Sequence, residues 1–150
     1  MRWQILTIGK PKLAFAKSGV TEYLGRLNPD PGVTFLPIKP AKGKSESESL
    51  LHSAGDSFLL TLDPNGVQWS SEELASHIQQ WQLERTKTIS VLIGGADGHS
   101  RELLQRSNKV WSLSKLTLQH ELALLVCLEQ IYRAFSILAN SPYHRGGKNG

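Results

Sequence analysis

The segment from Thr88 to Ile93 constrains the fold of this chain more than any other. It contains no charged residue, most of its side chains are apolar or β-branched, and it runs directly into the glycine loop Gly94-Gly95-Ala96-Asp97-Gly98. A short segment of this kind suits a strand that is buried on both faces, and such strands are typical of parallel sheets covered by helices. We therefore expect Thr88 to Ile93 to be a buried strand of a mainly parallel sheet.

The rest of the chain alternates between segments typical of strands and segments typical of helices. The other expected strands are Trp3 to Ile8, Val33 to Ile38, Phe58 to Leu62, and Val110 to Leu118 with a loop around Ser112 to Lys115. The expected helices are 13–27, a short helix that follows the polar loop 39–49, and then 70–83, 100–107 and 120–139. This alternation predicts an α/β domain whose mainly parallel sheet has helices on both faces.

A single domain accounts for the whole length. The chain has 150 residues, which is typical of one domain, and neither an internal repeat nor a change in composition marks a boundary. We expect one domain over residues 1–150, in which residues 141–150 form a tail after the last helix. Pro142 argues against further helix and favours an extended tail.

Three local signals indicate where elements begin and end. Pro37 lacks a backbone N–H, which favours an edge strand or a strand end for the segment that contains it. The run Asp63-Pro64-Asn65-Gly66 is a strong turn signal and is expected to end the strand that starts at Phe58. Ser70 and Glu73 have the spacing of a capping box, which predicts that a helix begins there.

The composition excludes several classes of protein. The single cysteine, Cys127, cannot close a disulfide within the chain or build a zinc site from cysteines, and its apolar surroundings indicate a buried thiol in a reducing compartment. The longest apolar run, Leu122 to Leu128, has seven residues, whereas a membrane span needs about 20. The first residues do not resemble a signal peptide. We expect a soluble, cytoplasmic protein that binds neither a membrane nor a metal.

The charge of the chain is compatible with a polyanionic partner. Seventeen Lys and Arg residues against thirteen Asp and Glu residues give a net charge of +4, and the isoelectric point is about 9.3. Lys39, Lys42 and Lys44 lie close together in the polar loop after the second expected strand. They are either contacts for phosphate groups or simply solvated side chains of a loop.

The expected last helix is apolar around most of its circumference. The apolar residues in question are Leu122, Leu124, Leu125, Val126, Leu128, Ile131, Phe135, Ile137 and Leu138. A helix with this distribution needs cover on two sides. A second copy of the chain would supply the second cover in a two-fold dimer, and wrapping of the helix by its own chain is the alternative.

Two segments have the features of a ligand-binding edge. The glycine loop follows a buried strand, where glycines let backbone N–H groups approach a ligand, although a plain tight turn uses the same residues. The loop matches neither the dinucleotide fingerprint nor a P-loop, which argues against a nucleoside triphosphatase. The stretch from Trp111 to Leu118 alternates small hydroxyl residues with apolar ones. It is either an amphipathic strand or a loop that offers apolar side chains to a flat ring.

The tail contains the third candidate segment, Tyr143-His144-Arg145. It combines an aromatic surface, an imidazole that titrates near neutrality and a guanidinium group that binds anions. A solvated tail without a binding role is the alternative. His52, His77 and His99 are expected to be solvated.

These three segments, in this order and at this spacing, resemble the RlmH-type family of the SPOUT superfamily. Members of that family methylate N3 of a pseudouridine in large-subunit (23S) ribosomal RNA. The resemblance extends over nearly the whole chain. It includes Ile8-Gly9-Lys10, Thr21-Glu22-Tyr23-Leu24, Thr61-Leu62-Asp63, Leu92-Ile93-Gly94-Gly95, Ser112 to Thr117, Glu129-Gln130-Ile131-Tyr132-Arg133-Ala134 and Tyr143-His144-Arg145.

The resemblance implies a C-terminal deep trefoil knot, a homodimer through the last helix, and S-adenosylmethionine as the cofactor. The residues that it places at the cofactor are Leu62, Gly94, Leu113, Ser114, Lys115, Leu116, Thr117 and Leu118. The residues that it places at the target nucleotide, and thus in catalysis, are Tyr143, His144 and Arg145. The candidates for contact with RNA are Arg133, Lys39, Lys42 and Lys44.

The implied reaction transfers a methyl group to N3 of the base, in free ribosomal RNA, in a subunit or in the assembled ribosome. N3 carries a proton that must leave before or during the attack, and we expect His144 to assist its loss. Arg145 would neutralise the negative charge that develops, and Tyr143 would position the base. The alternative is a non-catalytic RNA-binding module on the same scaffold, which would have no affinity for the cofactor.

Overall fold

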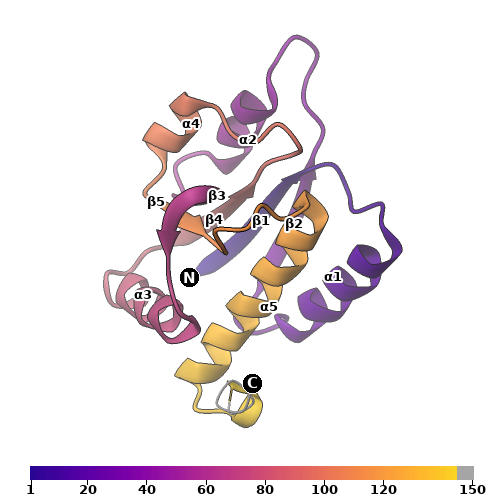
Figure 1. Cartoon of the computed structure of the whole chain (residues 1–150). Coiled ribbons are helices and arrows are strands. Elements are labelled where there is room, and N and C mark those ends of the chain that lie inside the picture. The colour runs from indigo at the N-terminus through magenta and orange to yellow at the C-terminus, as the bar shows by residue number, and fades with distance from the viewer. Residues whose placement is uncertain (145–150) are drawn as a thin grey trace.

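The computed structural model describes residues 1–144, in which a five-stranded sheet is flanked by helices (Figure 1). The strands are β1 (Arg2–Ile8), β2 (Val33–Ile38), β3 (Phe58–Gln68), β4 (Thr88–Ile93) and β5 (Lys109–Ser112). The helices are α1 (Ala14–Arg26), α2 (Glu46–Ala54), α3 (Ser71–Leu83), α4 (Arg101–Arg106) and α5 (His120–Leu138). The strand order is β2-β1-β4-β3-β5, and neighbouring strands are parallel. The predicted α/β architecture is confirmed.

The uncharged strand β4 lies at the centre of the sheet, between β1 and β3. Its residues from Ile89 to Ile93 are all buried. Because β4 has a strand on each side and a helical layer on each face, its sequence needs no polar side chain for solvent. β2, which contains Pro37, is an edge strand, where a missing N–H interrupts no ladder between two neighbours. Both predictions are confirmed.

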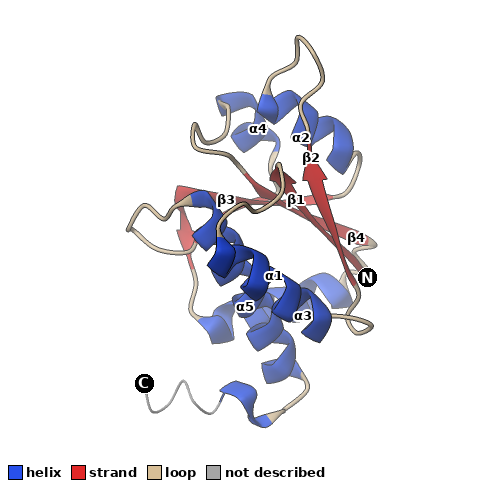
Figure 2. Cartoon of the chain, turned by 90° about the vertical axis from the view of Figure 1, so that its right-hand side faces the viewer, coloured by secondary structure: helices blue, strands red, loops and turns tan. Residues whose placement is uncertain are grey.

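Two layers of helices cover the sheet, with α1, α3 and α5 on one face and α2 and α4 on the other (Figure 2). Strand β1 contributes side chains to the packing on both faces of the sheet. Trp3 and Ile5 belong to the core that contains Leu128 of α5, whereas Leu6 belongs to the core that contains Leu103 of α4. Adjacent residues of a strand point to opposite faces, so one strand contributes to two cores.

Helix α5 lies against the sheet between α1 and α3 (Figure 1). It packs tightly on α1 at Gly19, where an added Cβ would stand 2.6 Å from Cδ1 of Leu125. Packing against these neighbours accounts for much of the apolar circumference of α5. Leu122 and Val126 are nevertheless only half-buried. The two-fold dimer stays a prediction, and so does the trefoil knot.

Polar side chains fix the starts of α3 and α5. The hydroxyl of Ser70 accepts a hydrogen bond from the N–H of Glu73, whose carboxylate accepts one from the N–H of Ser70. The predicted capping box is therefore confirmed. At α5 the side-chain oxygen of Gln119 accepts hydrogen bonds from two backbone N–H groups of the first turn, at 2.9 and 3.0 Å. Each arrangement satisfies N–H groups that the helix itself leaves unpaired.

Glu121 joins the start of α5 to the start of α1. Its carboxylate is buried and accepts hydrogen bonds from the N–H groups of Lys12 and Leu13, at 2.8 and 2.9 Å. The bonds favour the charged form, and they lower the pKa of Glu121. The first and last helices of the chain are thus linked through one side chain.

The expected turn at Asp63 to Gly66 is wrong. Strand β3 continues to Gln68, with a shift of register where it passes Trp111 of β5. At Gly66 an added Cβ would stand 2.6 Å from the carbonyl oxygen of Val110, so the backbone of β5 lies directly against this glycine. Because β5 pairs with β3 on both sides of the irregularity, the turn-forming residues make a bulge within the strand.

Of the expected strand from Val110 to Leu118, the part up to Ser112 and the loop around Ser112 to Lys115 are confirmed. The continuation of the strand to Leu118 is wrong, because β5 ends at Ser112. The hydroxyl of Ser112 donates a hydrogen bond to the carbonyl oxygen of Ser114 at 2.8 Å, and the hydroxyl of Ser114 accepts one from the N–H of Leu116 at 3.0 Å. Serine side chains that bond to nearby backbone offer an alternative to ladder pairing. The segment after Ser112 is therefore a loop that leads into α5.

Within residues 1–144, no helix is both long and apolar enough to span a membrane. In the same part of the chain, no group of three or more His, Cys, Asp or Glu side chains is placed to hold a metal ion. Cys127 is free and buried, as expected, and burial raises the pKa of its thiol.

Candidate functional site

A cavity of about 380 Å³ opens where β3 and β4 reach the carboxyl edge of the sheet. Three segments line it: the part of β3 around Leu62, the glycine loop after β4, and the loop that leads from β5 into the first turn of α5. Ligands of parallel α/β proteins bind at this edge. The volume lies in the range of pockets for small-molecule ligands and cofactors.

The cavity brings together nearly all residues that the resemblance places at the cofactor. Those that line it are Leu62, Gly94, Leu113, Ser114, Leu116, Thr117 and Leu118. Lys115 is the exception, since its side chain is exposed and does not line the cavity. Segments that are far apart in the sequence therefore converge on one site.

The glycine loop forms a wall of the cavity in which there is little room for side chains. At Gly94 an added Cβ would stand 3.2 Å from the carbonyl carbon of Gly98 and 3.2 Å from Cε1 of His99. Gly98 has a φ of +73°, a conformation that favours glycine. The leucine side chains of the facing loop supply apolar contact. A cradle of this kind fits the flat ring of a nucleoside cofactor.

His99 lines the cavity, and the expectation that it is solvated is wrong. Both ring nitrogens are buried, and neither has a hydrogen-bond partner among the described residues. Burial lowers the pKa of His99, against a smaller opposing effect of the nearby backbone of Leu92 and the carboxylate of Asp63. The imidazole is therefore a buried polar group in the wall of the site, with the backbone of Leu92 and Leu62 close to it.

We expect His99→Leu to stabilise the ligand-free protein at acidic pH. In the unfolded chain the histidine takes up a proton near its ordinary pKa of 6.5, whereas the folded protein resists protonation. Folding stability therefore falls as the pH drops below about 6.5. The variant should lose this dependence and melt about 2 to 4 °C higher at pH 5.5. The measurement is thermal unfolding between pH 5.5 and 8, with the exposed His52→Leu as the control. Equal pH dependence in His99→Leu and the wild type would contradict the assignment.

The tail is not extended, contrary to expectation. After α5 it turns back in a short 3₁₀ segment that ends at His144. Pro142 is compatible with the first position of such a turn, because its fixed φ lies in the helical range. Tyr143 and His144 then contact residues of α1, α3 and α5. Arg145 lies outside the described residues.

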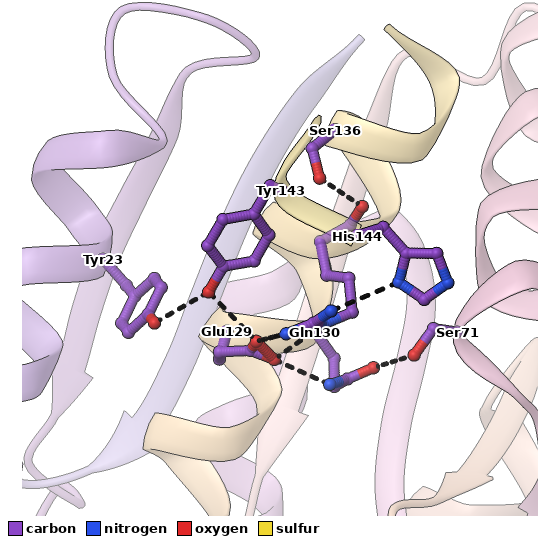
Figure 3. A network of polar contacts seen from close by, with 8 residues as sticks. Tyr23, Ser71, Glu129, Gln130, Ser136, Tyr143 and His144 are labelled. Atoms are coloured by element: carbon purple, nitrogen blue, oxygen red, sulfur yellow. Dashed lines mark hydrogen bonds and ion pairs between the residues drawn. The ribbon is translucent and has the colours of Figure 1, made fainter. Parts of the chain in front are cut away.

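Tyr143 is held between α1 and α5 (Figure 3). Its hydroxyl donates a hydrogen bond to the carboxylate of Glu129 at 3.3 Å and lies 2.9 Å from the hydroxyl of Tyr23. The guanidinium carbon of Arg133 lies 4.8 Å from the centre of its ring, a cation–π distance. Burial, followed by the bond to Tyr23, raises the pKa of Tyr143. The phenol therefore stays protonated at neutral pH and acts as a donor rather than a base.

His144 is held by two charged side chains. Arg133 donates to its Nδ1 at 3.2 Å, and its Nε2 bonds to Glu72 of α3. Arg133 is itself paired with Glu129 at 3.1 Å, one turn earlier in α5, and this pairing raises the pKa of Arg133. Arg133 is therefore a partner of the tail and of Glu129, not a solvated surface charge.

The tail and the cavity lie at different levels of α5. His120 and Ala123, in the first turns, line the cavity, whereas the hydroxyl of Tyr143 meets Glu129. Nine residues separate His120 from Glu129, which corresponds to about 14 Å along a helix. Methyl transfer needs reacting atoms about 3 Å apart. Within one chain, the structure does not bring the expected catalytic residues to the expected cofactor residues.

The loop after β2, which carries three lysines, leads into a helix that approaches the glycine loop. Lys39, Lys42 and Lys44 are exposed. The start of α2, which follows them, approaches the glycine loop, because an added Cβ on Gly95 would stand 3.1 Å from Oε1 of Glu46. The three lysines therefore belong to the same edge of the sheet as the cavity.

Sequence reasoning missed several residues of the site. Asp63, His99 and His120 line the cavity, and Glu72 and Tyr23 hold the tail. Asp63 directly follows a strand residue that the resemblance places at the cofactor, which is a usable signal. Tyr23 lies in a segment that carries the resemblance, but nothing there assigns it a role, and Glu72 carries no signal. The roles of both depend on where the tail folds back.

A parallel α/β sheet with this cavity at its carboxyl edge is the architecture of a methyltransferase family. Residues 1–144 match the family model described as "Predicted SPOUT methyltransferase", and the chain belongs to the SPOUT methyltransferase family.

Two curated relatives are both named "Ribosomal RNA large subunit methyltransferase H". The protein of Deinococcus radiodurans is 43% identical over 97% of this chain and 100% of its own length. That of Deinococcus deserti is 37% identical, with the same coverage of 97% and 100%. A solved structure of a probable methylase family protein from Haemophilus influenzae has a TM-score of 0.56 at 12% identity, over 95% of this chain and 69% of that one. This last likeness concerns the fold alone.

Proposed function

We propose that this protein transfers the methyl group of S-adenosylmethionine to N3 of a pseudouridine in large-subunit ribosomal RNA. The observation that carries the proposal is the convergence of Leu62, Gly94 and the loop from Leu113 to Leu118 on one cavity. Near full-length relatives named as large-subunit ribosomal RNA methyltransferases support the substrate class. The pseudouridine and its N3 come from the family resemblance.

The cavity residues bind and orient the cofactor, which supplies an activated methyl group when bound. Leu62, Leu116 and Leu118 offer apolar surface to the adenine ring. Backbone groups of Gly94 and of the loop that follows β5 would hold the polar edge of that ring. Leu116 is 73% exposed in the single chain, so a ligand or a second copy would cover an apolar side chain that now faces solvent.

The tail completes the site of a second copy in a two-fold dimer. Leu122, Val126, Glu129 and Arg133 are spaced by four, three and four residues and share one face of α5. If two α5 helices cross antiparallel near Val126, the level of Glu129 in one copy lies opposite Ala123 in the other. Ala123 lines the cavity, and Glu129 bonds to Tyr143. The arrangement therefore presents the tail of one copy to the cavity of its partner.

The tail residues then act on the base. His144 assists the loss of the N3 proton, the protonated hydroxyl of Tyr143 positions the base, and Arg145 neutralises the charge that develops. Positioning contributes much of the rate, since the methyl carbon and the attacking nitrogen must be aligned. Lys39, Lys42 and Lys44 contact phosphates near the cavity, which makes RNA binding weaken steeply with salt.

The test is a methyl-transfer assay with labelled S-adenosylmethionine on ribosomes, subunits and free RNA that lack the modification. Mass spectrometry of the product should place the label on N3 of a pseudouridine in large-subunit RNA. Label on another nucleotide would refute the substrate assignment.

A thermal-shift measurement, combined with the methyl-transfer assay, decides between an enzyme and a non-catalytic RNA-binding module. S-adenosylmethionine should raise the melting temperature, because a ligand that binds only the folded state stabilises it by mass action. RNA binding without any thermal shift from the cofactor and without label transfer would favour the module.

A further inference from the structure

Both ring nitrogens of His144 have charged partners, and the two partners differ in kind. Arg133 lies 3.2 Å from Nδ1, and a carboxylate oxygen of Glu72 bonds to Nε2. Glu72 comes from the first turn of α3, whereas Arg133 comes from α5. The imidazole thus bridges two helices on the tail side of the molecule. The hydrogen bond from His144 lowers the pKa of Glu72, which keeps this carboxylate charged.

The partners determine where the ring carries its proton. A guanidinium group only donates hydrogen bonds, so Nδ1 facing Arg133 must accept. A carboxylate only accepts, so Nε2 facing Glu72 must carry a hydrogen. The ring is therefore the neutral tautomer protonated at Nε2, and its only lone pair in the ring plane is on Nδ1.

We propose that Glu72 is a positioning residue for His144: it holds the ring by Nε2, so that Nδ1 is the nitrogen presented to the substrate. The inference rests on the proposed function for its chemistry. A carboxylate behind an imidazole fixes the tautomer and stabilises the cation that forms when the opposite nitrogen takes up a proton. Arg133 occupies Nδ1 until a base enters, and must give up this bond first.

Loss of the proton and gain of the methyl group both take place at N3 of the base. The N3–H bond of the base breaks, and its proton goes to Nδ1 of His144. The electron pair left on N3 forms the new bond to the methyl carbon. The bond between that carbon and the sulfonium sulfur breaks, and its electrons stay on sulfur as a neutral thioether. His144 ends as an imidazolium ion whose two N–H groups face Glu72 and the methylated base.

The experiment compares Glu72→Ala and Glu72→Gln with the wild-type protein. Nitrogen-15 NMR of the His144 ring should show Nε2 protonated and Nδ1 bare in the wild type. In Glu72→Ala, Arg133 still donates to Nδ1, so the Nε2 resonance should shift toward that of a solvated N–H while Nδ1 stays bare. The kcat of this variant should fall by about tenfold or more at nearly unchanged KM for RNA. Glu72→Gln should recover much of both, because an amide oxygen still accepts from Nε2–H.

The matched control is Glu73→Gln, which removes the same charge from the same turn of α3. Glu73 bonds to the N–H of Ser70 rather than to the tail, so its variant should leave the ring resonances and kcat unchanged. Unchanged resonances in Glu72→Ala, or an equal loss of kcat in Glu73→Gln, would overturn the proposal. If the wild type methylates no ribosomal substrate, the proposed function fails, and the NMR result still decides whether Glu72 positions the ring.

Discussion

Two inactive variants of this protein, when mixed, should recover methyl transfer. Gly94→Val crowds the glycine loop, because even a Cβ at this position stands 3.2 Å from the carbonyl carbon of Gly98. We expect it to abolish cofactor binding. His144→Ala leaves the cavity intact and removes the tail imidazole. Each variant alone should lose activity by about 100-fold or more.

Recovery is expected because the tail and the cavity of one chain lie at different levels of α5. In a mixed dimer, the intact tail of the Gly94→Val copy meets the intact cavity of the His144→Ala copy. One of the two sites then works. If half of all dimers are mixed, the mixture should show about a quarter of wild-type activity.

The measurement is methyl transfer after the two purified variants are unfolded and refolded together. The control is a chain that carries both substitutions, mixed with either single variant. Neither control mixture contains a dimer with an intact tail opposite an intact cavity. No recovery in the main mixture would show that the tail acts on the cavity of its own chain.

Gly66→Ala should destabilise the protein by about 2 to 3 kcal/mol, as expected for an added group in a packed interior. The new Cβ would stand 2.6 Å from the carbonyl oxygen of Val110 and 2.9 Å from the carbonyl carbon of Trp111. Both are backbone atoms of β5, which cannot turn aside as a side chain can, so the two strands must separate. The melting temperature should fall by about 4 to 12 °C.

The same substitution should weaken cofactor binding, because β5 leads into the loop that lines the cavity. Gly25→Ala is the control. Gly25 lies in α1, and no described atom beyond its own stretch of helix comes within 4 Å of an added Cβ. Alanine is the better helix former, so this variant should melt at or above the wild-type temperature. A melting temperature of Gly66→Ala equal to that of the wild type would contradict the close contact. Circular dichroism measures both variants.

Local patterns in the sequence predict the elements whose conformation depends on their own residues. The uncharged run from Thr88 to Ile93 is the central strand with the expected bounds, because hydrophobicity on both faces leaves few other environments. The capping box at Ser70 also needs only residues that are three apart. Where the conformation depends on a distant segment, the same reasoning fails. The sequence around Gly66 predicts a turn, but the structure has a bulge there, because the backbone of β5 lies against this glycine.

The residues of the candidate site also divide into those that the sequence predicts and those whose role depends on distant segments. The proposed cofactor residues follow from strand ends and from the family resemblance, and all of them except Lys115 line the cavity. The burial of His99 and the docking of Tyr143 could not be predicted from local sequence. Tyr143 bonds to Tyr23, a residue 120 positions earlier in the chain. Contacts between residues so far apart in the sequence produce no local periodicity from which they could be predicted.

The pairing of the chain's first strand has a consequence for its synthesis. Arg2 of β1 pairs with Thr88, the ring of Trp3 packs edge-on against Phe135 at 5.7 Å, and Glu121 holds the segment before α1. Strand β2 supplies early partners, but several other partners of the N-terminal residues are translated much later. Contacts of this range form slowly, and they leave apolar surface uncovered until they form. We expect the nascent chain to stay aggregation-prone until α5 has left the exit tunnel.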